Sequence, residues 1–403
     1  MKKNRLKWFI PLSATLLFAV YSQDVHAEET PETQVLTIYN EDLLSIPENY
    51  PTQFTFDSGV EIAYPEDGVK GVYVTGHSAG GSRLAELTNL LNDTELNAMV
   101  VDIKDDYGDM TLDLDSDNPI IQENTQNYVN DPAALMTHFE ENQIYPIARI
   151  VVFKDTRLAE ARPELSFTHS DGSIWKNNRG ESFVNPFSQE VWEYNVEIAK
   201  QAAKMGFKEI QFDYVRFPEG FETRSDELQY TRGGYEDMDL DDVQQRVESV
   251  TDFVKYAKKE LEPYGVDVSV DIFGYSATVP EAPGIGQNFS KISENVDVIS
   301  SMIYPSHWGP YFGIAKPDLE PYNIVSEYMK VENEVLGNLE SPPQSRPWLQ
   351  DFTASYLGSG NYLQYGPAEI EAQIRALKEA GVNEFLLWDA GNTYTKGVNY
   401  DLE

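Results

Sequence analysis

The chain has 403 residues, no cysteine, and a formal net charge of −37, from 30 Lys and Arg against 67 Asp and Glu. The lack of cysteine excludes disulfides and thiol catalysis, so stability must come from an apolar core that a chain of this length can build. So acidic a protein is a poor partner for nucleic acid or an anionic membrane surface. The charge suits a neutral or cationic partner, although solubility alone would also explain it.

The first 27 residues have the pattern of a secretory signal peptide. Basic residues at positions 2–7 precede an apolar stretch at 8–21, and small residues lead to a cleavage point after Ala27. The stretch is too short for a bilayer span and contains Pro11, which disfavours a retained anchor. We therefore expect a secreted or cell-wall-associated protein. Removing this segment, which carries a net charge of +3, would take the formal charge from −37 to −40.

Residues 28–66 and the rest of the chain differ in pattern. Residues 28–66 are rich in Glu, Pro, Thr and Asn and are expected to form a linker or an N-terminal embellishment. From residue 67 onward, strand-like and helix-like segments alternate. Strands are expected at 71–75, 98–103, 145–153, 209–217, 266–275, 296–304, 346–352 and 384–389, and helices at 82–91, 132–143, 188–205, 241–261, 321–335 and 367–380.

Boundary residues support this alternation. Pro132 and Pro367 stand where helices should begin, and Gly206, Gly265 and Gly381 stand where helices should end. A helix followed by glycine and a strand is typical of a parallel sheet. Eight strands in about 320 residues favour one (β/α)8 TIM barrel as a single catalytic domain over a doubly wound open sheet. The segments at 154–186 and 218–240 are long loops that are expected to build the substrate cleft.

Gly76–Gly80 matches the G-x-S-x-G elbow of serine hydrolases, which would make Ser78 a nucleophile. The later histidines, His138, His169 and His307, do not stand where a triad needs its base. No oxyanion segment of the HGGG type precedes the motif. An ordinary turn out of the first strand is the favoured interpretation, and a serine esterase is a minor alternative.

Metal sites have weak support. Asp113, Asp115 and Asp117 alternate as in a calcium loop, but the turn glycine is missing and Asn124 stands where the loop needs Glu. The five histidines show no zinc spacing. We expect no cofactor, with a structural calcium ion as the one metal option.

Carboxylates end several of the expected strands. Alternate apolar residues around Asp213 and Asp271 suit the face that helices cover, which directs both carboxylates toward the barrel axis. Asp389 ends the eighth strand on the same face as Phe385 and Leu387. These three acids are the candidate catalytic residues.

Paired carboxylates without thiol, zinc or triad indicate glycoside hydrolysis, in which one acid protonates the leaving oxygen and the other attacks or activates water. The competing explanation is a buried structural acid paired with Arg149 or Arg216. Aromatic and imidazole side chains also gather near strand ends, where a sugar could stack on them. They are Tyr214, Phe217, Tyr275, Tyr304, His307, Trp308, Trp348, Tyr356 and Trp388.

Five segments of the chain carry a family resemblance. In order along about residues 68–400, they resemble the signature segments of a bacterial family of glycoside hydrolase barrels long filed as a domain of unknown function. The segments are 212–218, 271–274, 302–308, 348–353 and 385–390. The resemblance implies a barrel and glycosidase chemistry, and it is more distant to barrels of the α-amylase and α-galactosidase type.

Those distant relatives imply residue roles. They place a nucleophilic Asp at the end of the fourth strand, which is Asp213 here. The general acid would be Asp271 on the fifth strand, with Asp389 and Asp351 as alternatives. The chain departs from the α-amylase pattern because Gln211, not Arg, stands two residues before the nucleophile.

The sequence as a whole predicts a secreted glycoside hydrolase that acts on an extracellular or cell-envelope polysaccharide with retention of configuration. Carbohydrate is the expected partner, and neither nucleic acid nor stable membrane insertion is expected. The alternative from another class is a noncatalytic glycan-binding barrel. Asp102, Lys104, Arg149 and Arg216 are expected to position substrate hydroxyls or to tune the acids.

Overall fold

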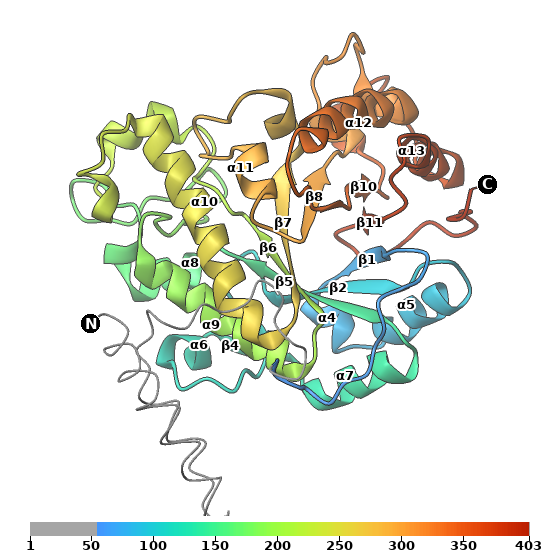
Figure 1. The fold of residues 1–403 in the computed structure, drawn as a ribbon, viewed down its shortest axis with the longest axis horizontal. Coiled ribbons are helices and arrows are strands. Elements are labelled where there is room, and N and C mark those ends of the chain that lie inside the picture. Colours follow the sequence, from blue (N-terminus) through green and yellow to red (C-terminus); the bar gives the residue numbers. More distant parts are fainter. Residues whose placement is uncertain (1–54, 403) are drawn as a thin grey trace, which may run out of the picture. The chain divides into compact units, whose positions relative to one another are not determined.

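The computed structural model describes residues 55–402; the expected signal peptide and most of the expected linker lie outside them. Eight parallel strands close into a barrel, because β1 (Lys70–Val74) pairs with both β2 (Ala98–Lys104) and β11 (Phe385–Trp388) (Figure 1). The predicted (β/α)8 barrel is confirmed. The other barrel strands are β5 (Tyr145–Val151), β6 (Glu209–Asp213), β7 (Asp267–Phe273), β8 (Val298–Met302) and β10 (Trp348–Gln350).

The seventh strand is interrupted by proline. β9 (Gln344–Ser345) and β10 both pair with β8, and Arg346-Pro347 separates them. Proline has no N–H to donate to a sheet ladder, so a break at this position is expected. Outside the barrel, β3 (Met110–Leu112) pairs antiparallel with β2, and β4 (Thr125–Val129) pairs with β3.

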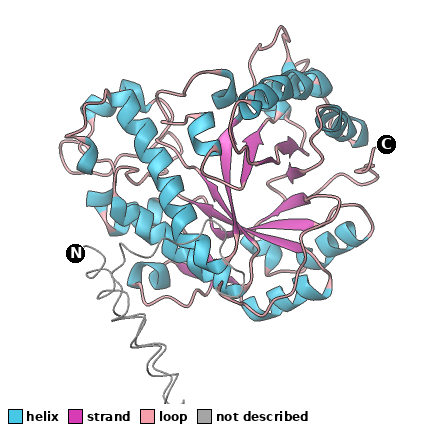
Figure 2. Cartoon of the chain, in the orientation of Figure 1, coloured by secondary structure: helices cyan, strands magenta, loops and turns pink. Residues whose placement is uncertain are grey.

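Helices surround the barrel and all six predicted helices are present within the described residues, with shifts of one or two residues at their ends (Figure 2). They are α5 (Arg83–Asn92), α7 (Pro132–Glu141), α9 (Gln189–Met205), α10 (Asp242–Leu261), α12 (Pro321–Gly337) and α13 (Pro367–Glu379). The shorter helices are α4 (Gly76–Ala79), α6 (Pro119–Glu123), α8 (Thr156–Ala161) and α11 (Phe289–Ser293).

The predicted helix boundary residues act as expected. Pro132 begins α7, and the side chain of the preceding Asp131 accepts a hydrogen bond of 2.9 Å from the N–H of Ala134. Gly206 ends α9 with φ of 112°, a left-handed conformation that favours glycine. Gly265 and Gly381 also have positive φ, at 64° and 84°. These signals fix where each helix ends and the next strand begins.

Apolar side chains form two layers, one on each side of the barrel wall. Val268, Val270 and Ile272 of β7 belong to the large outer layer between strands and helices. A smaller cluster fills the barrel interior, with Tyr73, Val100 and Ile147 among its members. Because strand side chains alternate between faces, Asp271 points to the interior, as predicted.

The amino-terminal end of the barrel is closed by a buried ion network. The guanidinium of Arg346 contacts Glu209 at 2.6 Å and Glu384 at 2.7 Å. Tyr64, from the segment that precedes the barrel, donates a hydrogen bond of 2.5 Å to Glu384. Lys208 donates to the carbonyl of Val60 in the same segment. This end is filled, so a ligand can enter the barrel only from the carboxyl ends of the strands.

Candidate active site

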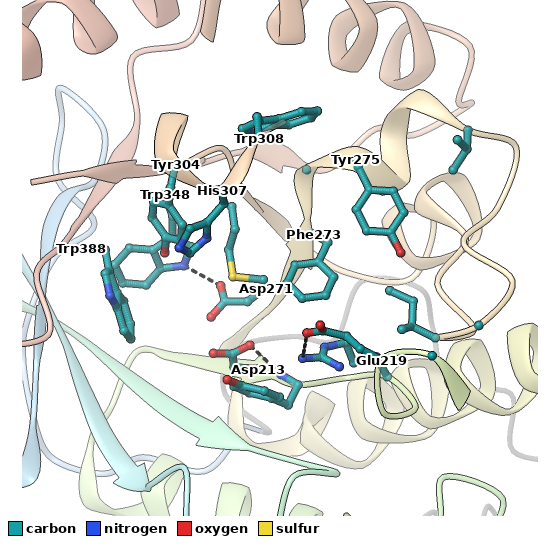
Figure 3. A pocket seen from close by; sticks show the side chains of 18 of the residues that line it. Asp213, Glu219, Asp271, Phe273, Tyr275, Tyr304, His307, Trp308, Trp348 and Trp388 are labelled. Atoms are coloured by element: carbon teal, nitrogen blue, oxygen red, sulfur yellow. Dashed lines mark hydrogen bonds and ion pairs between the residues drawn. The ribbon is translucent and has the colours of Figure 1, made fainter. Parts of the chain in front are cut away.

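A cavity of about 950 Å³ lies at the carboxyl ends of the barrel strands. Asp213, the last residue of β6, and Asp271 of β7 both line it, and their carboxyl groups face each other (Figure 3). This is the end of the fold where (β/α)8 enzymes have their sites. Nine of the predicted site residues line the cavity: Arg149, Asp213, Arg216, Asp271, Tyr304, His307, Trp308, Trp348 and Trp388.

Asp213 is held on both carboxyl oxygens. Arg149 donates to Oδ2 from Nη2 at 2.6 Å and from Nε at 3.0 Å. The N–H of Tyr214 donates to Oδ1 at 2.6 Å. Tyr214 has φ of 53°, an uncommon conformation for a bulky residue that persists only where the surroundings hold it. Asp213 therefore combines the expected ion pair with a place in the cavity wall.

Asp271 sits in a different environment. It is 2 % exposed, and its Oδ1 accepts a hydrogen bond of 2.7 Å from Nε1 of Trp348. Burial raises the pKa of Asp271 well above its usual value, and the negative charge of Asp213 raises it further, against the opposing effects of Arg149 and Trp348. The two acids of one cavity therefore have different surroundings: Asp213 is ion-paired with Arg149, whereas burial and the charge of Asp213 raise the pKa of Asp271.

Arg149 is positioned by two further carboxylates. Its Nη1 donates to Asp102 at 2.6 Å and its Nη2 donates to Asp106 at 3.0 Å. The hydroxyl of Tyr73 donates to the other oxygen of Asp102 at 2.5 Å. Burial raises the pKa of Asp102 to about 6, although Arg149 and Tyr73 lower it. Asp102 does not line the cavity, so its place is suited to orienting Arg149 and not to contacting a sugar.

The departure from the α-amylase pattern has a structural counterpart. Gln211 is buried and donates a hydrogen bond of 3.3 Å to Ser300. Its side chain is neutral and cannot form an ion pair with Asp213. Arg149 of the neighbouring strand β5 is the register partner of Gln211. The arginine that contacts Asp213 therefore comes from β5.

Aromatic side chains form one wall of the cavity. Trp388 stacks on Tyr73 with 4.1 Å between ring centroids, and the guanidinium of Arg149 lies 5.4 Å from the Trp388 centroid. Tyr304 meets the ring of His307 edge-on at 5.0 Å. Burial lowers the pKa of His307, which favours a neutral imidazole beside these rings. The wall offers flat apolar surfaces of the kind on which sugar rings stack.

The rim of the cavity is also aromatic. Tyr275 and Tyr311 are 40 % and 38 % exposed, and the ring of Trp308 lies 5.3 Å from that of Tyr311. The ring of Phe273 lies 5.9 Å from that of Tyr275, and Arg216 lies over the rings of Phe273 and Tyr214, at 4.6 and 4.8 Å. These exposed rings could extend contacts with a longer ligand beyond the two acids.

The structure corrects the expectation for Lys104. Its ammonium contacts Asp155 at 2.6 Å and donates to Asn195 of α9 at 2.7 Å, and it is fully buried outside the cavity. A register irregularity between Asp102 and Lys104 turns the latter to the helix side of β2. Without this irregularity, the two-residue spacing would have put both side chains on one face.

The other candidate acids also lie outside the cavity. Asp389 accepts hydrogen bonds from the N–H groups of Gly391 and Thr393, at 2.7 and 3.2 Å. Phe385 and Leu387, with which it shares a face, belong to the outer apolar layer, so this side of β11 faces away from the barrel axis. The expectation that Asp389 joins Asp213 and Asp271 is therefore corrected.

Asp351, the other alternative general acid, is also engaged elsewhere. It accepts a hydrogen bond of 2.6 Å from the hydroxyl of Thr395 and does not line the cavity. Burial raises the pKa of Asp351 to about 6, and Thr395 opposes that rise. Its contacts tie the carboxy-terminal segment to the end of β10.

Tyr73, Asp106 and Phe273 belong to the site but were not predicted. Tyr73 stands between Val72 and Val74, so the parity argument used for Asp271 would have directed it inward. Asp106 follows shortly after the second strand, in a position like that of the acids predicted at the ends of other strands. Phe273 is the last residue of β7. Glu219, which contacts Arg216 at 3.2 Å, lies in the loop at 218–240, which was expected to build the cleft although Glu219 itself was not singled out.

The serine motif does not assemble a triad. Ser78 lies in α4, and within the described residues its hydroxyl accepts a hydrogen bond from the hydroxyl of Thr75 at 3.2 Å. The adjacent His77 packs against Tyr128 with 3.7 Å between ring centroids and the rings tilted by 30°. Ser78 therefore has the contacts of a turn residue.

Residues 55–402 contain neither a cluster of metal ligands nor a membrane-spanning helix. No group of three or more His, Cys, Asp or Glu side chains there converges as metal ligands would, and Asp113, Asp115 and Asp117 are exposed. In the same residues, no helix combines the length and the apolar character needed to cross a bilayer.

Residues 71–394 match a protein family described as “Putative glycosyl hydrolase domain”. The chain belongs to this family. All residues that line the cavity at the carboxyl-terminal end of the barrel lie within the matched range. No curated protein sequence matches the chain.

Solved structures share the fold of this glycosyl hydrolase domain. The glycoside hydrolase domain of PgaB (BpsB) from Bordetella bronchiseptica has a TM-score of 0.53 and 13% identity, over 80% of this chain and 94% of that one. A beta-galactosidase from the psychrophilic Marinomonas ef1 has a TM-score of 0.54 and 11% identity, over 79% of this chain and 54% of that one. A hypothetical protein from Ruminiclostridium thermocellum ATCC 27405 is 34% identical over 50% of this chain and 96% of its own length, with a TM-score of 0.43.

Proposed function

We propose that the protein is a secreted glycoside hydrolase that cleaves an extracellular or cell-envelope polysaccharide with retention of configuration. One observation carries the proposal. Asp213 is ion-paired with Arg149, while Asp271 in the same cavity is buried with a raised pKa. Two carboxyl groups with opposite protonation states are what glycosidase chemistry requires of its nucleophile and its acid.

In the first step, an Asp213 oxygen attacks the anomeric carbon and the bond from that carbon to the glycosidic oxygen breaks. Asp271 donates its proton to the departing oxygen, which leaves as an alcohol. Trp348 bonds Oδ1 of Asp271 and so leaves Oδ2 to carry the proton. Arg149 fixes Asp213 in place for the attack.

In the second step, the ionised Asp271 takes a proton from water as that water attacks the anomeric carbon. The bond to Asp213 breaks, and the carboxylate returns to its ion pair with Arg149. Each residue ends in the state in which it began. The aromatic wall around Tyr304 and Trp388 supports the sugar ring, because its apolar face can lie against theirs.

The size of the cavity supports a polymeric substrate. Its volume of about 950 Å³ is at the upper end of the range for small-molecule sites, and its lining includes the exposed rings of Tyr275 and Tyr311 as well as the two acids. Export is supported by the basic and apolar pattern of residues 1–27.

The test is hydrolysis of a panel of neutral, amino and acidic polysaccharides by the purified protein. We expect Asp213→Asn to lower kcat by on the order of 10⁴-fold and Asp389→Asn, the matched acid outside the cavity, to change it less than about twofold. Proton NMR of the first product should show the anomer of the substrate. A wild-type protein that binds glycans but cleaves none would instead support the noncatalytic glycan-binding barrel.

Asp271 has its own test. An aryl glycoside with an acidic nitrophenol leaving group needs no proton, so Asp271→Ala should retain its first step on that substrate and lose hydrolysis of unactivated glycans. Added azide should then accelerate turnover and give a glycosyl azide of retained configuration. Equal losses on activated and unactivated substrates would contradict the assignment.

Export is tested by recovering the protein from culture medium of its native host and sequencing its amino terminus. We expect the secreted form to begin at Glu28. A form that retains residues 1–27 and sediments with membranes would contradict export.

A further inference from the structure

A second cavity of about 530 Å³ adjoins the first. The two share the lining residues Arg179, Tyr214, Arg216 and Glu219, so one ligand could occupy both. The side cavity is built by the loops at 154–186 and 218–240, the two stretches that the sequence assigned to the substrate cleft.

The charge of this side cavity is opposite to that of the whole chain. Five of its 13 lining residues are Lys or Arg and two are Glu, whereas the full chain has 30 Lys and Arg against 67 Asp and Glu. A cavity with low-dielectric walls concentrates the field of its charges. An anion that the rest of the surface repels is therefore attracted here.

Three of the five cations are compensated by carboxylates, and one of these is Lys176, which contacts Glu160 at 3.0 Å. Lys154 contacts Glu181 at 2.8 Å and Asp106 at 3.1 Å. Arg216 contacts Glu219 at 3.2 Å. Both glutamates of the cavity are engaged in this way, so neither cancels the charge of the remaining cations.

Arg179 and Arg224 supply the excess positive charge. Neither has a carboxylate within ion-pair distance among the described residues, and each can present its guanidinium to a ligand. Arg224 lies over the ring of Trp175 at 5.4 Å, which restricts its orientation. The side chain of Asn177 accepts from the N–H of Arg179 at 2.9 Å and fixes the turn that carries it. The planar fork of a guanidinium matches the two oxygens of a carboxylate or phosphate.

We propose that the side cavity is a subsite for a sugar that carries an anionic group, bound by Arg179 and Arg224 while the neighbouring part of the chain lies across Asp213 and Asp271. Tyr214, which follows Asp213, lines both cavities and places the anionic sugar on the Asp213 side of the cleft. This inference rests on the proposed glycoside hydrolase function and names its substrate class: an acidic polysaccharide.

Binding at the subsite can be measured by NMR of the full chain, using the indole N–H of Trp175 as a local probe identified with Trp175→Phe. The ligands are glucuronate for a carboxylate source, glucose 6-phosphate for a phosphate source, and glucose as the neutral control. We expect one or both anionic sugars to shift the Trp175 signal and glucose to leave it unchanged. The double variant Arg179→Gln/Arg224→Gln should raise the Kd by about tenfold.

A control variant removes the same charge elsewhere. Arg375 is exposed on α13, lines neither cavity, and has no carboxylate within ion-pair distance among the described residues. Arg375→Gln should leave the Kd unchanged. If neither anionic sugar shifts the Trp175 signal, or if the double variant binds them as the wild type does, the inference is overturned.

Hydrolysis separates this inference from the function on which it rests. An acidic polysaccharide should be cleaved faster than the same polymer with its carboxylates reduced to alcohols, and the double variant should lose that preference. Cleavage of both polymers at equal rates would overturn the subsite and retain the glycoside hydrolase. Anionic sugar binding without cleavage of any glycan would retain the subsite and overturn the hydrolase.

Discussion

The indole Nε1 of Trp348 donates a hydrogen bond of 2.7 Å to Oδ1 of Asp271, which links β10 to β7 across the floor of the cavity. Trp348 is 1 % exposed, so this tryptophan is set to orient the acid and not to lie under a sugar ring. Its N–H stabilises the ionised carboxylate and lowers a pKa that burial raises. The contact therefore affects both the position and the protonation of the proposed acid.

Trp348→Phe keeps a ring at this position and removes the donor. We expect the pKa of Asp271 to rise further, so the alkaline limb of kcat/KM should move to higher pH, because the acid keeps its proton longer. Lost orientation should lower kcat at the optimum by about tenfold. The measurement is a pH profile of kcat/KM. Trp192→Phe, a change in a buried tryptophan of α9 that bonds Pro186, should not move that limb.

Tyr73→Phe tests the support of Arg149. The tyrosine hydroxyl lowers the pKa of Asp102 from the value that burial would set, and the resulting pKa is about 6. Without the hydroxyl this pKa should rise, so Asp102 would protonate at higher pH and hold Arg149 less firmly. The acid limb of kcat/KM should therefore move upward from near pH 6. An acid limb that stays in place would contradict this role of Asp102.

Lys104→Met separates stability from catalysis. The substitution leaves Asp155 as an uncompensated buried charge, which should lower the free energy of unfolding by roughly 3–5 kcal/mol. Urea unfolding monitored by tryptophan fluorescence measures the loss. Lys104→Met/Asp155→Asn should recover part of it, because no charge then stays unpaired. The kcat/KM of the folded fraction should be unchanged. A large fall in kcat/KM would show that Lys104 contributes to catalysis after all.

Ser78→Ala tests the esterase alternative. Because Ser78 bonds Thr75 and no imidazole among the described residues, a serine-reactive phosphonate should not label it. The alanine variant should cleave glycans within about twofold of the wild-type rate. Intact-mass analysis after phosphonate treatment decides the point. Labelling that disappears in the variant would favour an esterase.

Most of the fold could be predicted from local pattern. The periodicity of apolar residues located eight barrel strands and six helices, and Pro132 and Gly206 marked helix ends through their own backbone preferences. The expected seventh strand at 346–352 was drawn without a break, although Pro347 lies inside it and proline cannot donate to a sheet ladder.

The candidate site could be predicted in part. Strand parity directed Asp213 and Asp271 inward because both lie in regular strand geometry. The same argument failed for Lys104, since a register irregularity in β2 reverses the side on which a residue lies. It also could not tell which face of the last strand is interior, and Asp389 turned out to share the outer one.

The sequence by itself determined the parallel barrel and a set of strand-end acids and aromatic residues, because these depend on periodicity and residue chemistry along one strand. Only the tertiary structure decided which of them act together. Arg149 reaches Asp213 from the next strand, and Trp348 reaches Asp271 from a strand 77 residues further along the chain. The burial and the neighbouring charge that raise the pKa of Asp271 arise only when distant segments pack together.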